Sequence, residues 1–256
     1  EQYREVRFMA ENSNTISNAY TELVHFPIPN GNRNLYGGGY GRLRPTRELY
    51  LSYVENDIRR DHNITGQYSS TSPKTETVDG VSYYVPDPIG PISTKINWCT
   101  GKFRMQAPED KVIPNHATAI NYPLLRYADV LLQYAEALYF TGDETEPRKI
   151  LSTIRERAAN PESDVSSLND AYYKDDFIEE LLDERKRELC FETKRRIDLI
   201  RFDKLEEAIL SIDPTAGNLN EQVLEVRYNY QYNKIWFPIP LTQIDLNGNL
   251  RPNPEY

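Results

Sequence analysis

Three glutamates spaced four residues apart, Glu184, Glu188 and Glu192, are the side chains of this sequence best spaced for acid–base chemistry. Paired carboxylates act as general acid and general base in glycoside hydrolysis. Arginines stand among these glutamates at the i+3 and i+4 positions that pair charges along a helix. Such pairing lowers a carboxyl pKa, whereas a general acid needs a raised one. We therefore interpret the set as structural and name no catalytic residue.

The stretch that carries these glutamates, residues 177–202 (FIEELLDERKRELCFETKRRIDLIRF), has the pattern of a long helix with charge inside its apolar stripe. At about 100° per residue, leucines and isoleucines share one side of the helix with arginine and glutamate. A charge in an apolar stripe is costly to desolvate unless it is paired, which favours an internal network that holds two layers in register. We expect this network to contain Glu184, Arg185, Glu188, Glu192 and Arg196.

Other reactive side chains lack the spacing that catalysis or metal binding requires. His25, His62 and His116 are scattered, so no pair shares a helix face, and the sequence leaves any metal, calcium included, unknown. No serine or cysteine stands in a recognisable nucleophile elbow. Cys99 and Cys190 are far apart and outside any CxxC motif, which leaves one long-range disulfide open.

A glycine run at residues 37–41 (GGGYG) is not a phosphate-binding loop. It lacks the Lys-Ser/Thr that follows in a P-loop, and it does not join a clear strand to a helix. We interpret it as a surface loop whose neighbouring Tyr36 and internal Tyr40 are within reach of a ligand. The sequence indicates no cofactor.

Aromatic side chains are the remaining candidates for binding. The chain has 19 Tyr against 8 Phe and 2 Trp, which suits partly wet binding surfaces and equally suits loop-rich folds with half-buried anchors. A sugar needs a flat aromatic face and polar groups at its hydroxyl edge, and each candidate can instead be a packing residue. The ligand-binding candidates are Trp98, Asn97, Tyr83, Tyr84, Tyr40 and Tyr68.

Composition excludes several classes of function. The formal net charge of -9 opposes general nucleic-acid binding, which relies on dense Lys/Arg. No run approaches the roughly 20 apolar residues that cross a bilayer. The first residues, EQYREVRFMAENSN, have neither the basic nor the apolar part of a signal peptide, so the protein is either cytosolic or represented here without its leader.

The chain divides into two regions of different composition, and these regions position the candidate residues. Residues 1–122 are turn-rich, with short strand-like pieces at 5–8, 81–85 and 95–106 and one helix at 47–60 that Thr46 can cap. We expect this region to be the ligand-binding half. Residues 123–256 are helical and finish in an extended arm, because prolines and asparagines exclude a long helix there.

The helical part begins with a predicted antiparallel hairpin. Its first helix starts at Pro123 and stops at Gly142, and its second starts at Pro147 and stops at Pro161. The pair resembles a tetratricopeptide unit. Such units need about three copies to bury their faces, so the neighbours lie elsewhere in the fold or outside this chain.

Several segments occur in an order that resembles the SusD/RagB family. They are the helix LLRYADVLLQYAEAL, the helix with IRERA, the segment ERKRELCFETKRRIDLIRF and a tail with FPIP and NLRPNPEY. The match covers Pro123 to Tyr256 strongly. It extends more weakly to PTRELYLSYVENDIRR, which resembles the family helix before its Asp-x-Arg-Arg element, here Asp57, Arg59 and Arg60.

The resemblance implies a mainly α, SusD-like fold: a tetratricopeptide-type hairpin, a long charged helix and a loop-rich region with short β-strands. It implies a surface lipoprotein of the Bacteroidetes outer membrane that captures glycans and passes them to a SusC-type TonB-dependent transporter. The family's lipidated cysteine and early helices are missing here, so the chain resembles the C-terminal portion of such a protein. We expect this portion to form one structural unit. Contact with the membrane is expected only through the absent anchor.

Three functional hypotheses follow, and no enzyme is expected. The first is non-catalytic binding of an oligosaccharide and its delivery to the transporter. The alternative is a protein-interaction module that docks the transporter without a sugar site of its own. A glycoside hydrolase is the least favoured, because no pair of carboxylates can be nominated.

Overall fold

The computed structural model describes residues 7–10, 43–68, 74–89, 98–104, 122–161, 164–214 and 221–253. The chain forms two compact units, one of residues 1–195 with 216–218 and the other of residues 196–215 with 219–256. The first unit therefore holds both the loop-rich region and the predicted hairpin. The prediction of a mainly α fold is confirmed.

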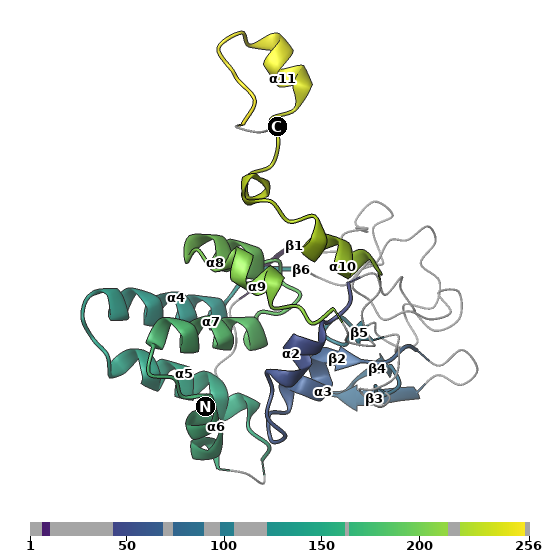
Figure 1. Ribbon diagram of the computed structural model, residues 1–256. Coiled ribbons are helices and arrows are strands. Elements are labelled where there is room, and N and C mark those ends of the chain that lie inside the picture. The colour runs from purple at the N-terminus through teal and green to yellow at the C-terminus, as the bar shows by residue number, and fades with distance from the viewer. Residues whose placement is uncertain are drawn as a thin grey trace. The chain divides into compact units, whose positions relative to one another are not determined.

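A helical hairpin lies on one side of the first unit, at the left of Figure 1. It consists of α4 (Tyr127–Phe140) and α5 (Glu146–Ala158), joined where Gly142 adopts a φ of 94°, a conformation that favours glycine. Helix α7 (Phe177–Glu188) packs against both helices and α6 (Val165–Tyr172) packs against α5. The shared core is Leu132, Ala135, Leu151, Ile154, Phe177, Leu181 and Leu189.

The predicted long charged helix is divided in two. Helix α7 ends at Glu188, and α8 spans Arg195–Arg201. Between them Phe191 and Thr193 have φ values of 66° and 60°, outside the helical region. The physical reason is a side-chain cap. Lys102 donates a hydrogen bond of 2.7 Å to the carbonyl of Glu188 and so replaces the backbone N–H that a continuing helix would have supplied.

The predicted helix at 47–60 is also divided. Thr46 caps it as expected, accepting from the N–H of Leu49 at 3.3 Å. The N–H of Val54 then donates to the hydroxyl of Tyr172 at 3.0 Å, which ends the helical hydrogen bonding. The two resulting helices are α2 (Arg47–Leu51) and α3 (Arg59–Asn63).

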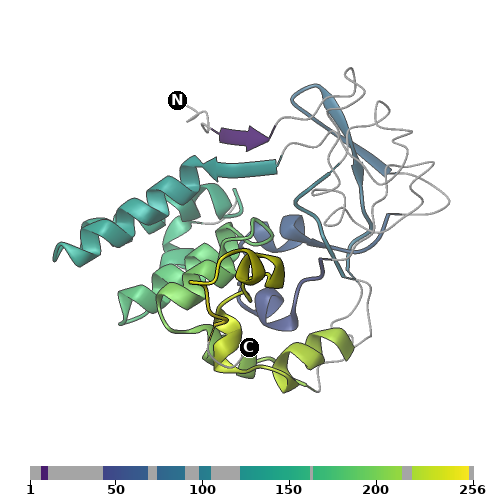
Figure 2. The same cartoon turned by 90° about the horizontal axis from the view of Figure 1, so that it is seen from above.

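Short antiparallel strand pairs complete the described part of the first unit. Strand β6 pairs with β1 and runs directly into α4 (Figure 2). Strands β3 and β4 form a hairpin whose turn places Asp79 and Gly80 at φ values of 50° and 79°. The three pairs are β1 (Arg7–Ala10) with β6 (Tyr122–Arg126), β2 (Ile64–Thr65) with β5 (Cys99–Thr100), and β3 (Lys74–Val78) with β4 (Val81–Val85).

The second unit contains short helices. Arg227 donates hydrogen bonds to the carbonyls of Leu210 and Ile212, which ties α10 to the end of α9. The predicted extended arm includes a 3-10 turn and a six-residue helix. Within the described ranges, no helix has both the length and the apolarity to span a bilayer. After α8, the elements are α9 (Leu205–Leu210), α10 (Glu221–Tyr228), η1 (Tyr232–Ile235) and α11 (Leu241–Leu246).

Candidate functional site

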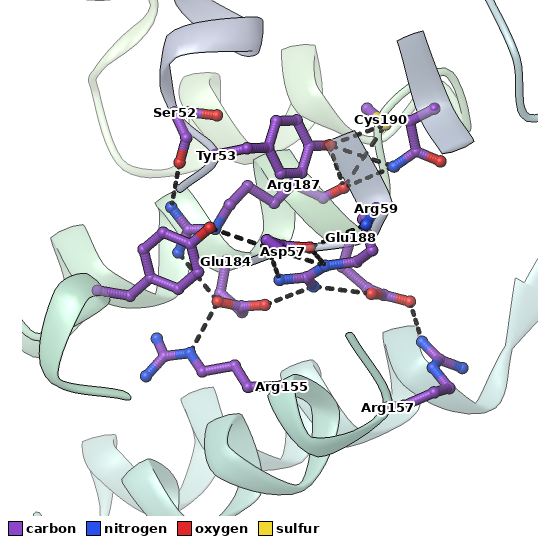
Figure 3. A network of polar contacts seen from close by, with 12 residues as sticks. Ser52, Tyr53, Asp57, Arg59, Arg155, Arg157, Glu184, Arg187, Glu188 and Cys190 are labelled. Carbon is purple, nitrogen blue, oxygen red and sulfur yellow. Dashed lines mark hydrogen bonds and ion pairs between the residues drawn. The ribbon is translucent and has the colours of Figure 1, made fainter. Parts of the chain in front are cut away.

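A buried network of charged side chains lies between α7, α5 and α3 (Figure 3). Glu184 is fully buried and accepts from three arginines. Its carboxylate lies 2.7 Å from Nη1 of Arg59, 3.0 Å from Nε of Arg155 and 2.9 Å from Nη2 of Arg187. Arg59 also pairs with Asp57 at 2.7 Å. Charge-assisted hydrogen bonds of this kind compensate the cost of burying each ion.

The other two glutamates extend the network toward β6. Glu188 accepts from Nη1 of Arg59 at 2.9 Å and from Nη1 of Arg126 at 2.7 Å. Glu192, in the turn after α7, accepts from Nε of Arg126 at 2.8 Å and pairs with Lys102. Arg126 therefore bridges the last turn of α7 and the turn that follows it.

The network fixes the protonation of its carboxyls. Burial alone would raise the pKa of Glu184, but the charges of Arg59, Arg187 and Arg155 outweigh burial and hold that pKa well below its usual range. Glu188 has the same balance, with burial opposed above all by Arg126 and Arg59. Both carboxylates stay charged at neutral pH, which is unsuited to general-acid catalysis.

The other predicted network members lie apart from this cluster. Arg185 donates to Asp129 of α4 at 3.1 Å, and both side chains are buried. Arg196 belongs to the second unit, where it donates to the carbonyl of Ile235 at 2.7 Å and lies 4.9 Å from the centre of the Phe237 ring. The structure thus brings the three glutamates together, with Arg185 in a separate pair.

Most of the basic partners in the structure are not among the predicted network residues. Arg155 follows Leu151 by one helical turn, so it lies in the apolar stripe of α5, the same kind of pattern that predicts the network on α7. Arg59 belongs to the Asp-x-Arg-Arg element, which by itself predicts no ion pair. Arg126 and Lys102 carry no local signal, because their partners are fixed by the fold.

The aromatic candidate Trp98 is a core residue. Its side chain is 1% exposed, and its ring lies 5.2 Å from that of Tyr50. It packs in a cluster with Leu49, Tyr53, Ile64 and Cys190. Within the described residues its indole N–H has no hydrogen-bond partner.

Two further tyrosine candidates pack against each other. Tyr68 and Tyr84 are both buried, with ring centres 6.4 Å apart in an edge-to-face arrangement. Tyr83, the preceding residue in β4, is partly exposed. Because successive side chains of a strand point to opposite faces, Tyr83 lies on the face away from Tyr84.

A carboxylate lies opposite Tyr83 across the hairpin. Glu76 of β3 lies directly opposite Tyr83 in the strand register and forms an ion pair with Arg104. Arg104 also donates from Nε to the carbonyl of Gly101 at 3.1 Å. An aromatic ring beside a carboxylate and a guanidinium has the composition that sugar binding requires.

Several predicted residues are not described. Tyr40, Asn97, the glycine run at 37–41, His25 and His116 lie outside the described residues. Cys99 and Cys190 are both described, and no disulfide joins them. In the described ranges, no group of three His, Cys, Asp or Glu is arranged to hold a metal ion.

The comparisons with known proteins agree with one another. The model of the SusD family matches residues 5–256. SusD-like protein P2 of Formosa agariphila is 32% identical over 226 residues, 85% of this chain and 41% of that protein. Starch-binding protein SusD of Bacteroides thetaiotaomicron is 30% identical over 149 residues, 56% of this chain and 23% of that protein.

Solved structures share the fold. Surface glycan-binding protein A from Bacteroides thetaiotaomicron, in complex with laminarihexaose, aligns with a TM-score of 0.61 at 19% identity, over 99% of this chain and 52% of that one. The corresponding protein from Bacteroides fluxus aligns with a TM-score of 0.58 at 20% identity, over 97% of this chain and 50% of that one. The chain therefore spans about half or less of the length of these relatives.

Proposed function

Because this chain belongs to the SusD family, we propose that the protein binds an oligosaccharide without cleaving it and delivers it to a SusC-type TonB-dependent transporter. The observation that carries the proposal is the family match over nearly the whole chain. The 30% identity to a starch-binding relative further supports a glycan as the ligand.

The state of the buried carboxylates supports a role without catalysis. Glu184 and Glu188 are at most 4% exposed and are held by arginines in their charged form. A retaining or inverting hydrolase needs one carboxyl that is protonated and reaches the glycosidic oxygen. We propose that these two carboxyls have a structural role. We propose that recognition of the sugar relies on aromatic stacking and hydrogen bonds from the loop-rich region.

The proposed place of action is the outer surface of the outer membrane. The family resemblance implies an attachment through a lipid anchor. Capture beside a transporter raises the local concentration of a weakly bound sugar, so modest affinity for each sugar unit is sufficient. We propose no nucleic-acid partner.

A glycan panel tests the proposal directly. The 256-residue chain is titrated with neutral and acidic oligosaccharides by calorimetry, and the same samples are assayed for reducing sugar. We expect binding of at least one oligosaccharide and no release of reducing ends. Absence of binding across the panel would overturn glycan capture, and release abolished by a single Asp or Glu substitution would revive the hydrolase.

An exposed apolar stripe on α4 favours a second candidate, a module that docks the transporter without a sugar site. Tyr127, Val130 and Tyr134 recur at helical spacing and are 40%, 43% and 54% exposed. Tyr134→Asp is expected to weaken co-purification with a co-expressed SusC-type transporter. If the triple substitution of Trp98, Tyr83 and Tyr84 by Ala leaves a folded protein with unchanged glycan and transporter binding, the docking module is favoured.

A further inference from the structure

We propose that the exposed face of the β3–β4 hairpin is a subsite for one neutral pyranose ring, with Tyr83 as the stacking platform and Glu76 and Arg104 at its polar edge. This inference rests on the proposed glycan binding and specifies where on the described surface it occurs. It also specifies which chemical class of sugar the subsite accepts.

The strand register places Tyr83 and Tyr84 on opposite faces of the hairpin, and of the residues in β3 and β4 only Tyr84 is buried. Glu76 is paired with Tyr83, and the adjacent pair is Thr75 with Tyr84. Directly opposed residues of antiparallel strands project to the same side, and adjacent pairs project to opposite sides. Tyr84 is buried against Tyr68, so the face with Glu76 and Tyr83 is the one directed away from this packing.

The polar edge matches the needs of a pyranose. The Glu76 side chain is 44% exposed, which leaves carboxylate surface available to accept from a sugar hydroxyl. Arg104 keeps its side chain 14% exposed and is anchored through Nε to the carbonyl of Gly101 at 3.1 Å. A fixed guanidinium has further N–H groups for a second hydroxyl. Tyr83, directly opposite Glu76 in the strand register, supplies the ring for the apolar C–H face of the sugar.

The charges around this face favour a neutral sugar. Lys74 pairs with Asp87 at 2.5 Å, and Arg104 pairs with Glu76. Asp79 adds a further negative charge at the turn, so the hairpin region carries two basic and three acidic side chains. Among the described residues of the hairpin region, Lys74 and Arg104 are both paired with carboxylates, so they offer a uronate or sulfated sugar no unpaired positive charge. The hydroxyls of a neutral pyranose can use both members of the Glu76–Arg104 pair.

Local hydrogen bonds hold the platform in place before a ligand arrives. Thr77 and Ser82 are hydrogen-bonded across the strands at 3.0 Å. At the end of the hairpin, the N–H of Asp87 donates to the carbonyl of Gln67 at 2.9 Å, and the N–H of Gly66 donates to the carbonyl of Asp87 at 2.7 Å. A face fixed in this way loses little entropy on binding.

Substitutions on the hairpin test the subsite. The full chain and its variants are titrated by calorimetry with maltohexaose, laminarihexaose, cellohexaose, xylohexaose and hexagalacturonate. For the neutral oligosaccharide that binds wild type, we expect Tyr83→Ala to weaken affinity about tenfold, Tyr83→Phe less than twofold, and Glu76→Gln severalfold. Tyr228→Ala, at an exposed tyrosine of α10, is the matched control and should change affinity less than about twofold. Circular dichroism and thermal unfolding verify that each variant is folded.

The outcomes separate the subsite from the general proposal. If wild type binds a neutral oligosaccharide and folded Tyr83→Ala binds it equally well, the subsite is overturned and glycan binding stands. If the hairpin variants lower only the melting temperature, the Glu76–Arg104 pair is structural and the subsite is again overturned. Tighter binding of hexagalacturonate than of every neutral probe would overturn the assignment to neutral sugars. Failure of wild type to bind any probe counts against the proposed function itself.

Discussion

Nη1 of Arg59 lies 2.7 Å from the carboxylate of Glu184, although 125 positions separate the two residues in sequence. The same guanidinium nitrogen lies 2.9 Å from Glu188, and Nη2 pairs with Asp57 (Figure 3). One buried side chain of α3 thus joins two successive turns of α7. These contacts join α3 to α7.

Removal of Arg59 should strongly destabilise the protein. Arg59→Ala leaves the buried carboxylates of Glu184 and Asp57 short of a partner, and breaking a buried ion network from one side costs about 3–5 kcal/mol. Urea unfolding measures the loss. Arg60→Ala is the matched control, because its partner Asp61 is 70% exposed and such pairs contribute about 1 kcal/mol or less. Equal losses for the two variants would contradict a structural role for the network.

Arg185 should matter for stability and leave ligand affinity unchanged. Its buried pair with Asp129 joins α7 to α4, so Arg185→Ala is expected to lower the free energy of unfolding by about 3 kcal/mol. Oligosaccharide affinity of the folded variant should equal that of wild type. Lys149→Ala, which removes an exposed pair with Glu146, should alter neither property. A folded Arg185→Ala variant with wild-type stability would be inconsistent with this assignment.

Acid should destabilise the protein through its paired carboxyls. The pKa values of Glu184 and Glu188 lie below their ordinary range, and burial, which would raise the pKa of Asp183, is outweighed by Lys186 and Lys174, which lower it to about 2. These carboxyls bind protons more weakly in the folded state than in the unfolded state. Their contribution to the free energy of unfolding is therefore complete above their unfolded pKa values of about 4, and it is lost as the pH falls through their folded pKa values. The contribution of these three carboxyls to stability should be constant above about pH 5 and should fall below about pH 4.

Asp183→Asn isolates one of these groups. Urea unfolding of wild type and variant at several pH values should show a shallower loss of stability in the variant between about pH 4 and pH 2, because one proton-linked group is missing. A variant whose stability declines as steeply as that of wild type would rule out Asp183 as a contributor.

The two tryptophans should respond differently to truncation. Trp98 is 1% exposed within an aromatic and aliphatic cluster, so Trp98→Ala is expected to lower the free energy of unfolding by about 3–5 kcal/mol. Trp236 is 62% exposed, and Trp236→Ala should cost less than about 1 kcal/mol. We expect Trp98→Phe to fold and keep oligosaccharide affinity. Lost affinity in a folded Trp98→Phe variant would return Trp98 to the set of ligand contacts.

Local signals allowed the hairpin to be predicted. The hairpin is indicated by the apolar spacing along α4 and α5, by Gly142 and by Pro147. Each of these signals affects the backbone only within a few residues of its own position. The break after Glu188 escaped prediction because a residue 86 positions away, Lys102, donates to its carbonyl. Helical periodicity continues through that break and carries no sign of it.

The candidate site shows the same limit. Tyr83 and Tyr84 are adjacent and chemically identical, and only the pairing of β4 with β3 decides that one is buried and the other partly exposed. Sequence indicated which residue types could bind a sugar. It did not indicate that Glu76 and Arg104 would meet beside one of them, because that contact depends on where the hairpin lies relative to the segment after β5.

The ties to α7 also determine which parts of the chain can vary in length. Arg59, Lys102, Arg126 and Arg155 each fix one point of the chain to α7 or to the turn after it. The turns between these points close loops, and doubling the length of a flexible loop adds only about 0.6 kcal/mol of closure entropy. We therefore expect insertions and deletions in such turns to be tolerated better than substitutions at the tie points, so one frame can carry turns of several lengths.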